Sequence, residues 1–257
     1  MDLQSFYSVV RAEQLAGPPQ WGSLLLCGQE RVTYRKAMEY LRPGMRVLDW
    51  GAGNGHFSVF LARNGFEPDA YMIDDPPALL CQPGIRFTKG ADPKLLPYPS
   101  ESFDAVFGVG VLEHVRERDG DERASLAELT RILKPGGLLF ILHLPNAYSW
   151  LEAANRLGKR LGRPRLPHDF IYSRHAFHAL LPGVGLNVIE EGRYNLLPRS
   201  TINRLGRSIT DATWFCTLFD RLDDFSTALL GPLSQNLYFV LRKGSAGSGP
   251  GSTRCSP

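Results

Sequence analysis

Short apolar runs and longer amphipathic stretches alternate along most of the chain. The runs end at an acid, a glycine or a proline, whereas the longer stretches place apolar residues every three or four positions. The first pattern is typical of buried strands and the second of helices that cover a core. We therefore expect an α/β domain around a mainly parallel sheet. The expected strands lie near residues 46–49, 68–73, 85–88, 105–108, 138–144, 186–190 and 236–241, and the expected helices near residues 28–41, 57–62 and 121–133.

Four parts of the chain stand outside this alternation. Residues 1–43 precede the first strand and predict an arm, broken near Gly17, that leads into a helix. Residues 145–181 and 192–231 follow the fifth and sixth strands and are too long for simple connections. Residues 244–257 are rich in glycine, serine and proline, so we expect a disordered tail. The sequence thus predicts one domain over residues 1–243, with two long insertions.

The composition narrows the class of protein. The chain has 257 residues, enough for one domain with a substantial core, and 29 basic against 26 acidic residues give a net charge of +3. That charge does not by itself indicate a nucleic-acid or membrane partner. The four cysteines lie far apart, so we expect neither a metal site nor a disulfide framework. Because no apolar run approaches ~18 residues and no signal-peptide layout begins the chain, we expect a cytoplasmic protein without an integral membrane segment.

The residues with the clearest chemistry form a glycine turn at 46–57, RVLDWGAGNGHF. Asp49 stands where the first strand ends, and Gly51, Gly53 and Gly55 alternate with other residues before the next helix begins. Glycine is required where a ligand lies against the backbone or where φ is positive. The following helix directs its free N–H groups at the same place. This turn predicts a cofactor-binding site.

The spacing of the glycines distinguishes two classes of cofactor. A dinucleotide-binding turn has G-x-G-x-x-G, but here His56 occupies the place of the third glycine, which disfavours NAD. The string from Asp49 to Gly55 instead resembles motif I of the class I S-adenosylmethionine-dependent methyltransferases. Later segments strengthen the resemblance: Leu96-Pro97 before S-F-D, the dipeptide Glu113-His114, and the turn L-K-P-G-G at 133–137.

The resemblance implies a Rossmann-like seven-stranded sheet with the order 3-2-1-4-5-7-6, strand 7 antiparallel, helices on both faces and a lid from the two insertions. It implies that S-adenosylmethionine is held by Asp49, the three glycines, and Val109 at the end of the fourth strand. It also implies that Asp92 accepts the adenine amino group. The ribose should be bound by an acid at the end of the second strand. We assign that role to Asp74, which follows Met72-Ile73 directly, and interpret Asp75 as a turn or N-cap residue.

Three histidines are candidates for a general base, because the pKa of histidine is near neutrality. His114 follows the fourth strand and also suits a packing role beside the adenine. His143 ends the fifth strand. His168 lies in a segment similar to one in small-molecule and ubiquinone-type methyltransferases, in which the histidine comes from the lid. We rank His168 first among the three.

The acceptor must be recognised by the two insertions and the N-terminal arm. Arg156, Lys159, Arg160, Arg163 and Arg165 could hold an anionic group or form a solvated helix face. Eight aromatic residues could wall an apolar pocket: Tyr148, Trp150, Phe170, Tyr172, Phe177, Tyr194, Trp214 and Phe215. We expect methyl transfer to a small or carrier-linked acceptor, with oxygen as the nucleophile.

Several alternatives to this function are left open or disfavoured. N- or C-methylation stays open, as does an inactive S-adenosylmethionine-binding scaffold. Nucleic-acid acceptors are disfavoured, because Asp75-Pro76-Pro77 lacks a following aromatic residue and no cysteine follows a proline. The sequence does not determine the oligomeric state.

Overall fold

The computed structural model describes Tyr7 and residues 22–92, 94–118, 120–162 and 170–244. Most of the predicted N-terminal arm, His168 and all but the first residue of the predicted disordered tail lie outside these residues. None of the described helices is both long enough and apolar enough to cross a membrane.

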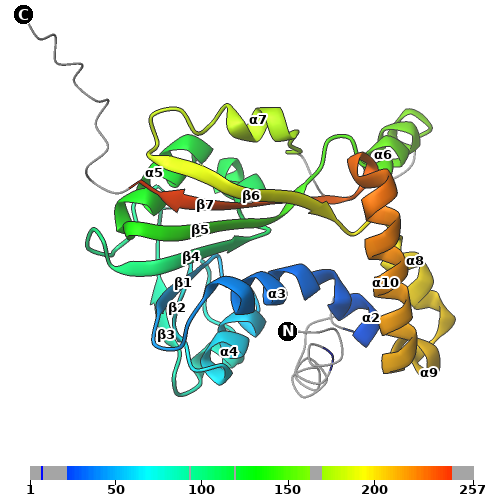
Figure 1. Cartoon of the computed structure of the whole chain (residues 1–257), viewed down its shortest axis with the longest axis horizontal. Helices are drawn as coiled ribbons and strands as arrows, with labels where there is room; N and C mark the ends of the chain where they lie inside the picture. Colours follow the sequence, from blue (N-terminus) through cyan, green and yellow to red (C-terminus); the bar gives the residue numbers. More distant parts are fainter. Residues whose placement is uncertain (1–6, 8–21, 93, 119, 163–169, 245–257) are drawn as a thin grey trace, which may run out of the picture.

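A seven-stranded sheet forms the centre of the domain (Figure 1). The predicted order, β3-β2-β1-β4-β5-β7-β6, is confirmed, and β7 pairs antiparallel with both β5 and β6. The chain order reverses between β1 and β4, where the carboxyl ends of parallel strands leave a crevice for a ligand. The strands are β1 (Arg46–Trp50), β2 (Glu67–Met72), β3 (Arg86–Lys89), β4 (Phe103–Val109), β5 (Leu133–Pro145), β6 (Leu186–Tyr194) and β7 (Asn236–Lys243).

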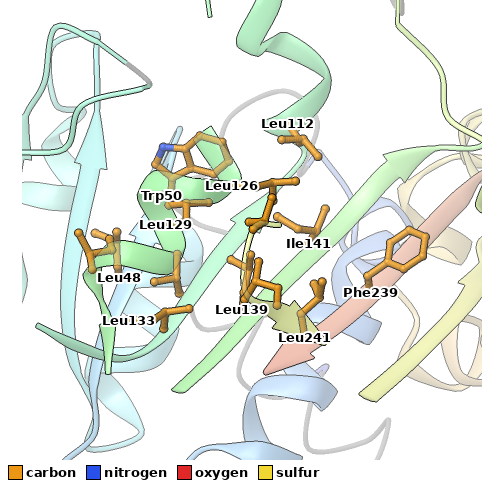
Figure 2. Packing of buried hydrophobic residues seen from close by; sticks show 14 of the residues in the cluster. Leu48, Trp50, Leu112, Leu126, Leu129, Leu133, Leu139, Ile141, Phe239 and Leu241 are labelled. Carbon is orange, nitrogen blue, oxygen red and sulfur yellow. The ribbon is translucent and has the colours of Figure 1, made fainter. Parts of the chain in front are cut away.

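Helices cover both faces of this sheet and divide the core into two clusters. On one face α3 and α4 pack against Phe140 and Phe107, and Cys216 and Phe219 of α10 belong to the same cluster. On the other face α5 and α7 pack against Leu139 and Ile141, as Figure 2 shows for α5. The domain therefore has three layers. These helices are α3 (Arg31–Tyr40), α4 (His56–Arg63), α5 (Glu122–Ile132), α7 (Arg174–His178) and α10 (Thr213–Leu230).

The remaining helical segments lie around the sheet and at one end of the molecule. They are α2 (Leu24–Cys27), η3 (Gly28–Glu30), η4 (Ala78–Cys81), η5 (Leu112–Arg118), α6 (Trp150–Arg160), α8 (Arg199–Ile202), η6 (Asn203–Leu205), α9 (Arg207–Thr210) and η7 (Gly231–Leu233). In Figure 1, α6, α8, α9 and α10 gather at the right-hand end.

Strands β5 and β6 extend furthest beyond the ranges that the sequence predicts. Strand β5 begins at Leu133 because this residue already pairs with Phe103, and the L-K-P-G-G turn bulges out of the ladder before Leu138 pairs with Ala105. Gly136 has φ +74°, a value that glycine adopts without strain. Strand β6 continues to Tyr194, because β7 offers it partners as far as Asn236.

A second bulge interrupts β5 near its carboxyl end. Ile141 pairs with Phe239 and Leu144 with Leu237, so β5 has one residue more than β7 between these pairs. His143 lies in the bulge with φ +63°, a left-handed conformation that is uncommon outside glycine. Bulges of this kind redirect side chains and are frequent beside active sites.

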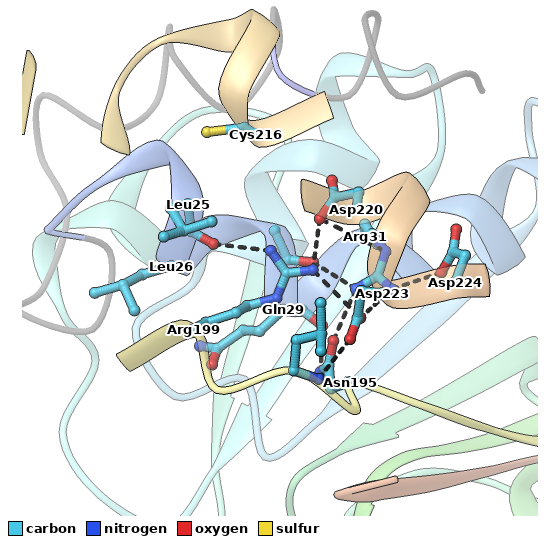
Figure 3. A network of polar contacts seen from close by, with 12 residues as sticks. Leu25, Leu26, Gln29, Arg31, Asn195, Arg199, Cys216, Asp220, Asp223 and Asp224 are labelled. Atoms are coloured by element: carbon cyan, nitrogen blue, oxygen red, sulfur yellow. Dashed lines mark hydrogen bonds and ion pairs between the residues drawn. The ribbon is translucent and has the colours of Figure 1, made fainter. Parts of the chain in front are cut away.

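A buried network of charges fastens α10 to the rest of the domain (Figure 3). Arg31 donates through Nη2 to Asp223 and to Asp224, each at 2.6 Å. Arg199 donates to Asp220 at 2.5 Å. Asp220 and Asp223 are fully buried, and such carboxylates are stable only when paired. We call Arg31, Arg199, Asp220 and Asp223 the Arg–Asp network.

Candidate active site

The glycine turn has the backbone that its sequence predicts. Gly51, Gly53 and Gly55 have φ values of +77°, +51° and +83°. A Cβ on Gly51 would lie 2.5 Å from Cγ2 of Val111, and one on Gly55 would lie 2.7 Å from Cδ2 of Leu80. Both the backbone conformation and the close approach of neighbours therefore require glycine at these positions.

A first cavity, the Asp49 cavity, lies against one side of this turn. It has a volume of about 590 Å³ and is lined by Asp49, the turn itself, Thr33, Tyr34, His56, Phe57, Glu30 and Val109. Asp49 is buried and accepts a hydrogen bond of 2.6 Å from Oγ of Ser58. Burial raises the pKa of its carboxyl to about 6. Oγ1 of Thr33 is buried without a hydrogen-bond partner among the described residues, so it is available to a ligand.

A second cavity, the Asp74 cavity, lies against the other side of the turn at the ends of β2 and β4. It has a volume of about 690 Å³ and includes Asp74 and His114 in its lining. The other lining residues are Trp50, Gly51, Gly53, Tyr71, Met72, Ile73, Gly110, Val111 and Val115. The two cavities share Gly51 and Gly53, so a ligand that lies across the glycine turn can occupy both.

A third cavity, the His143 cavity, lies between the sheet and the two insertions. Its volume is about 740 Å³. It is lined from the first insertion by Ser149, Leu151 and Glu152 and from the second by Asn195, Leu197, Arg199 and Ser200, together with Leu26, Gln29, His143, Pro145, Gln235 and Asn236. Most of these side chains are polar.

His143 lies where the third cavity meets the first. Its Nδ1 is 3.3 Å from the hydroxyl of Tyr194 and 3.9 Å from Oε1 of Glu30, which lines the Asp49 cavity. The bulge in β5 turns the imidazole toward Tyr194 and Glu30, which belong to the α3 side of the sheet. Burial raises the pKa of Tyr194 well above its usual value, so its hydroxyl keeps its proton. An imidazole therefore stands between the Asp49 cavity and the third cavity.

Glu113 adds a second carboxyl to this region. It is buried, and its Oε2 has no hydrogen-bond partner among the described residues. Burial raises its pKa, and the nearby His114 and His143 oppose that shift. A Cβ on Gly110 would lie 3.8 Å from Oε1 of Glu113 and 3.9 Å from Cβ of His143, which places the carboxyl close to the bulge.

A model of the methyltransferase-domain family matches residues 29–191, which is more than half of the chain. The chain belongs to the class I S-adenosylmethionine-dependent methyltransferases. S-adenosylmethionine is therefore the cofactor of this methyltransferase. The prediction drawn from motif I is confirmed.

Curated relatives from the same family match 54% to 61% of this chain. The methyltransferase is 30% identical over 156 residues to the ubiquinone/menaquinone biosynthesis C-methyltransferase of Bordetella parapertussis, covering 54% of this chain and 59% of that one. It is 32% identical over 170 residues to the demethylmenaquinone methyltransferase of Deinococcus radiodurans, covering 61% and 60%. The chain thus spans about three fifths of the length of these relatives.

Solved structures with the same fold include S-adenosylmethionine-dependent methyltransferases from Methanosarcina mazei and from Archaeoglobus fulgidus. Each has a TM-score of 0.57 and 17% sequence identity to this chain. The matches cover 82% and 83% of this chain and 97% and 92% of the other chains. At this identity the likeness establishes the fold alone.

The residues around the glycine turn fit S-adenosylmethionine. The glycine turn has positive φ throughout and lines both cavities, Asp74 is exposed at the end of β2, and the hydroxyl of Thr33 is buried and available. Val109 lines the Asp49 cavity. Asp92 does not line either cavity. Its Oδ1 accepts from the amide of Lys94 at 2.7 Å, and its carbonyl accepts from the hydroxyl of Tyr71, which lines the Asp74 cavity.

Asp75 has a different role from the one that its sequence suggests. Its carboxylate pairs with Nζ of Lys89 at 2.5 Å, and Lys89 keeps the pKa of this carboxyl below its usual value. The short helix that follows begins at Ala78 with Pro77 as its N-cap. The interpretation of Asp75 as a helix N-cap is therefore wrong, because Pro76 and Pro77 continue as extended chain.

The candidate bases His114 and His143 line different cavities. His114 lines the Asp74 cavity, and its Nδ1 is 2.9 Å from Oε1 of Glu117, so it lies on the side away from the third cavity. His143 lines the third cavity. His168 lies outside the described residues. Sequence reasoning did not find Glu30 or Thr33, because nothing in the pattern of the 28–41 helix links it to a cavity.

The prediction that eight aromatic residues wall an apolar acceptor pocket is wrong for the third cavity, the His143 cavity. None of the eight aromatic residues lines it, although Tyr194 touches His143. Tyr148 and Trp214 are exposed to solvent, and Phe177 stacks on Phe239 in the opposite core cluster. The first insertion divides between the two faces of the sheet, which the linear sequence does not show. Arg156, Lys159 and Arg160 lie exposed on α6, and Arg163 and Arg165 lie outside the described residues.

Proposed function

We propose that this methyltransferase transfers the methyl group to a small phenolic or enolic acceptor bound in the His143 cavity, at the carbon beside the hydroxyl. The observation that carries the proposal is the position of His143 between the Asp49 cavity and the third cavity. The names of the Bordetella and Deinococcus relatives support a small aromatic acceptor, and the first of them supports carbon as the nucleophile.

The proposed roles follow from the contacts of the site. S-adenosylmethionine supplies an electrophilic methyl group, so the protein has to align the acceptor and remove its proton. We assign the cofactor to Asp49, Gly51, Gly53, Gly55, Asp74 and Val109, with Asp92 supporting the Asp74 cavity through Tyr71. Thr33 is an additional candidate.

His143 is the proposed general base. Tyr194 contacts its Nδ1, so we assign Nε2 to the hydroxyl of the acceptor. The carboxylate of Glu30, 3.9 Å from Nδ1, stabilises the imidazolium that forms when the proton is taken. Removal of the proton places negative charge on the oxygen and, by resonance, on the neighbouring carbon. The carbon would then take the methyl group as the methyl–sulfur bond breaks and S-adenosylhomocysteine leaves. Loss of the proton on that carbon to solvent, and return of the proton from His143 to the oxygen, would restore the hydroxyl.

Oxygen is the second candidate nucleophile, and the same base supports it. A phenolate formed by His143 carries charge on oxygen as well as on carbon, so the position of the acceptor decides the product. The sequence analysis favoured oxygen, and the relative's name favours carbon. Mass spectrometry and NMR of the methylated product distinguish an O-methyl from a C-methyl group.

The experiment that tests the proposal compares turnover with cofactor binding. Turnover is measured on a panel of hydroquinones and catechols, and binding of S-adenosylhomocysteine is measured by calorimetry. We expect His143→Ala to lower kcat by ~10²–10⁴-fold, the range for a lost general base, while binding of S-adenosylhomocysteine is unchanged. His178→Ala, whose imidazole pairs with Glu191 on the surface, is the matched control.

Four outcomes would overturn parts of the proposal. Unchanged turnover in His143→Ala would remove His143 as the base, and a large loss in His168→Ala would transfer the role to that residue. Binding of S-adenosylhomocysteine without turnover on any acceptor would favour the inactive scaffold. Tighter binding of NADH than of S-adenosylhomocysteine would contradict the cofactor assignment.

A further inference from the structure

The exposed apolar side chains of the methyltransferase are concentrated at one end. Among the described residues, every large hydrophobic residue that is well exposed belongs to residues 148–161 or 205–233, apart from Leu95 and Ile189. These two ranges contain α6, α9 and α10, which Figure 1 places together at the right-hand end. A contiguous group of exposed apolar side chains is unusual on a protein that contacts only water.

Helix α10 carries the longest part of this surface. Trp214, Leu218, Leu222, Phe225 and Leu229 follow one another at intervals of four, four, three and four residues. This spacing puts them along one side of the helix. Trp214, Phe225 and Leu229 are 68%, 64% and 67% exposed. The opposite side of α10 is buried and holds Asp220 and Asp223 of the Arg–Asp network, so the outer stripe is not needed for the core.

The exposed charges around the stripe are mostly positive. Exposed cations lie on α6, η6, α9 and α10, namely Arg156, Lys159, Arg160, Arg204, Arg207 and Arg221. The acids of the same elements are fewer. Glu152, Asp220 and Asp223 are buried, and Asp224, partly exposed, pairs with Arg31. What this end presents to solvent is therefore mainly apolar and cationic.

The apolar and cationic character of this surface indicates which kind of partner binds to it. Two copies of the chain joined through α10 in a symmetric contact would bring the same cations together, and like charges across an interface oppose binding. An anionic lipid surface instead accepts apolar side chains below its headgroups and attracts lysine and arginine at the headgroup level. Tryptophan and tyrosine are the residues that favour that boundary, and Trp214 and Tyr148 are among the most exposed here.

We propose that α10 and α6 form a docking surface for an anionic phospholipid membrane, on which the methyltransferase lies without crossing it. The surface adjoins the third cavity, because the first turns of α6 and α8 provide Ser149, Leu151, Glu152, Arg199 and Ser200 to its lining. Docking thus brings the acceptor cavity next to the lipid. An acceptor with an apolar tail would enter the third cavity from the membrane, and its tail would stay in the lipid.

The first test measures binding of the whole chain to vesicles by flotation. One set of vesicles contains phosphatidylcholine alone, and in the other about a third of the lipid is phosphatidylglycerol. We expect at least ~tenfold stronger partitioning to the anionic vesicles. We also expect this preference to disappear at ~1 M salt, where the Debye length falls to about 3 Å. Equal binding to both sets, or none to either, overturns the proposal.

The second test uses variants on exposed positions, where folding is little affected. Phe225→Ser with Leu229→Ser removes the centre of the stripe and should lower partitioning at least ~tenfold, because two apolar side chains no longer enter the lipid. Leu95→Ser, equally exposed but far from this end, is the matched control. Arg156→Gln with Lys159→Gln should lower partitioning ~tenfold to 30-fold. Arg35→Gln with Arg63→Gln removes the same charge from elsewhere and should change little.

Three readouts keep the proposal falsifiable. Binding of S-adenosylhomocysteine by each variant shows that the fold and the cofactor site are intact, so a failed docking test is separable from a failed assignment of function. Equal losses in the variants and their controls contradict the docking surface. A dimer in sedimentation velocity that Phe225→Ser with Leu229→Ser converts to a monomer would show instead that the stripe joins two copies of the chain.

Discussion

The cofactor side and the proposed acceptor side of this methyltransferase are formed by different kinds of structure. On the cofactor side, the site is made of consecutive backbone, the turn from Gly51 to Gly55, and of acids at the ends of adjacent strands. On the proposed acceptor side, the third cavity is assembled from Gln29, His143, Ser149, Asn195 and Asn236, which are far apart in the chain. A local motif specifies the first side, and long-range hydrogen bonds and charges specify the second.

The difference shows which kind of change each side tolerates. The turn around Gly51 leaves no room for a Cβ, so adding a single methyl group there would force neighbouring atoms to move. The acceptor side is held by side chains, such as Arg31 and Asp223, whose removal leaves partners buried and unpaired. The four predictions below separate the two sides, beginning with the largest expected effect.

Breaking the Arg–Asp network should destabilise the whole domain. Asp223 accepts from Arg31 at 2.6 Å and from the amide of Leu197 at 2.7 Å, and it is fully buried. Asp223→Ala should lower the free energy of unfolding by ~3–5 kcal/mol, the range for removing one partner of a buried ion pair. Asp224 contacts the same Nη2 of Arg31 at the same distance, but its side chain is 41% exposed. Asp224→Ala is the control and should cost at most ~1 kcal/mol in denaturant titration; equal losses would contradict this view of the network.

A methyl group in the glycine turn should abolish tight cofactor binding. Gly51→Ala places its Cβ 2.5 Å from Val111 and strains a residue with φ +77°. We expect S-adenosylhomocysteine to bind ~100-fold more weakly, because the turn must shift away from the cofactor. Gly44→Ala has the same kind of strain at φ +84°, but open space surrounds its Cβ. That control should lose stability while its affinity in calorimetry is unchanged, and a similar loss of affinity in both variants would count against the cradle.

The two neighbouring acids after β2 should differ in cofactor binding. Asp74 lines the Asp74 cavity, whereas Asp75 pairs with Lys89. Asp74→Ala should weaken binding of S-adenosylhomocysteine by roughly 1.5–3 kcal/mol, the range for hydrogen bonds to a charged group. Asp75→Ala should have a much smaller effect. The reverse order in calorimetry would mean that the ribose carboxylate is assigned one residue too early.

The buried carboxyl at the end of β1 should make the stability of the cofactor-free protein depend on pH. Burial raises the pKa of Asp49 to about 6, so the folded protein holds this proton more tightly than the unfolded chain does. The resulting stability is complete below pH ~4 and is lost as the pH rises through about 6. Asp49→Asn should therefore increase the free energy of unfolding by ~1–3 kcal/mol at pH 7 and by little at pH 4. A difference that does not vary with pH would contradict this prediction.

The sequence was sufficient for the sheet and for most of the cofactor side. The order of the strands follows from the resemblance to the methyltransferase family. The glycine turn with its positive φ values and the place of Asp74 follow from short segments whose spacing is fixed by one strand and one turn. The extent of β5 does not follow from its sequence. The L-K-P-G-G turn was expected to precede the strand, whereas the ladder with β4 begins before the turn.

The acceptor side shows why the remainder could not be predicted. Along β5, Leu138, Phe140 and Leu142 face one core cluster, and Leu139 and Ile141 face the other. Strict alternation would put His143 with Ile141, on the α5 side. The bulge instead turns it toward Tyr194 and Glu30. No local signal in H-L-P-N marks this extra residue, since the bulge depends on β7 as a partner. The same holds for Arg31 and Arg199, whose acidic partners on α10 are distant in the chain.

The bulge in β5 also has a consequence for how this protein can lose its chemistry. A deletion of the single codon for His143 would give β5 and β7 equal numbers of residues between the pairs Ile141–Phe239 and Leu144–Leu237. Leu142 and Leu144 would keep their places in the two clusters. A gene lacking those three nucleotides would then encode a chain with an uninterrupted ladder, an intact glycine turn and no imidazole beside the third cavity. If His143 is the base that we propose, one codon separates a methyltransferase from a protein that only binds the cofactor.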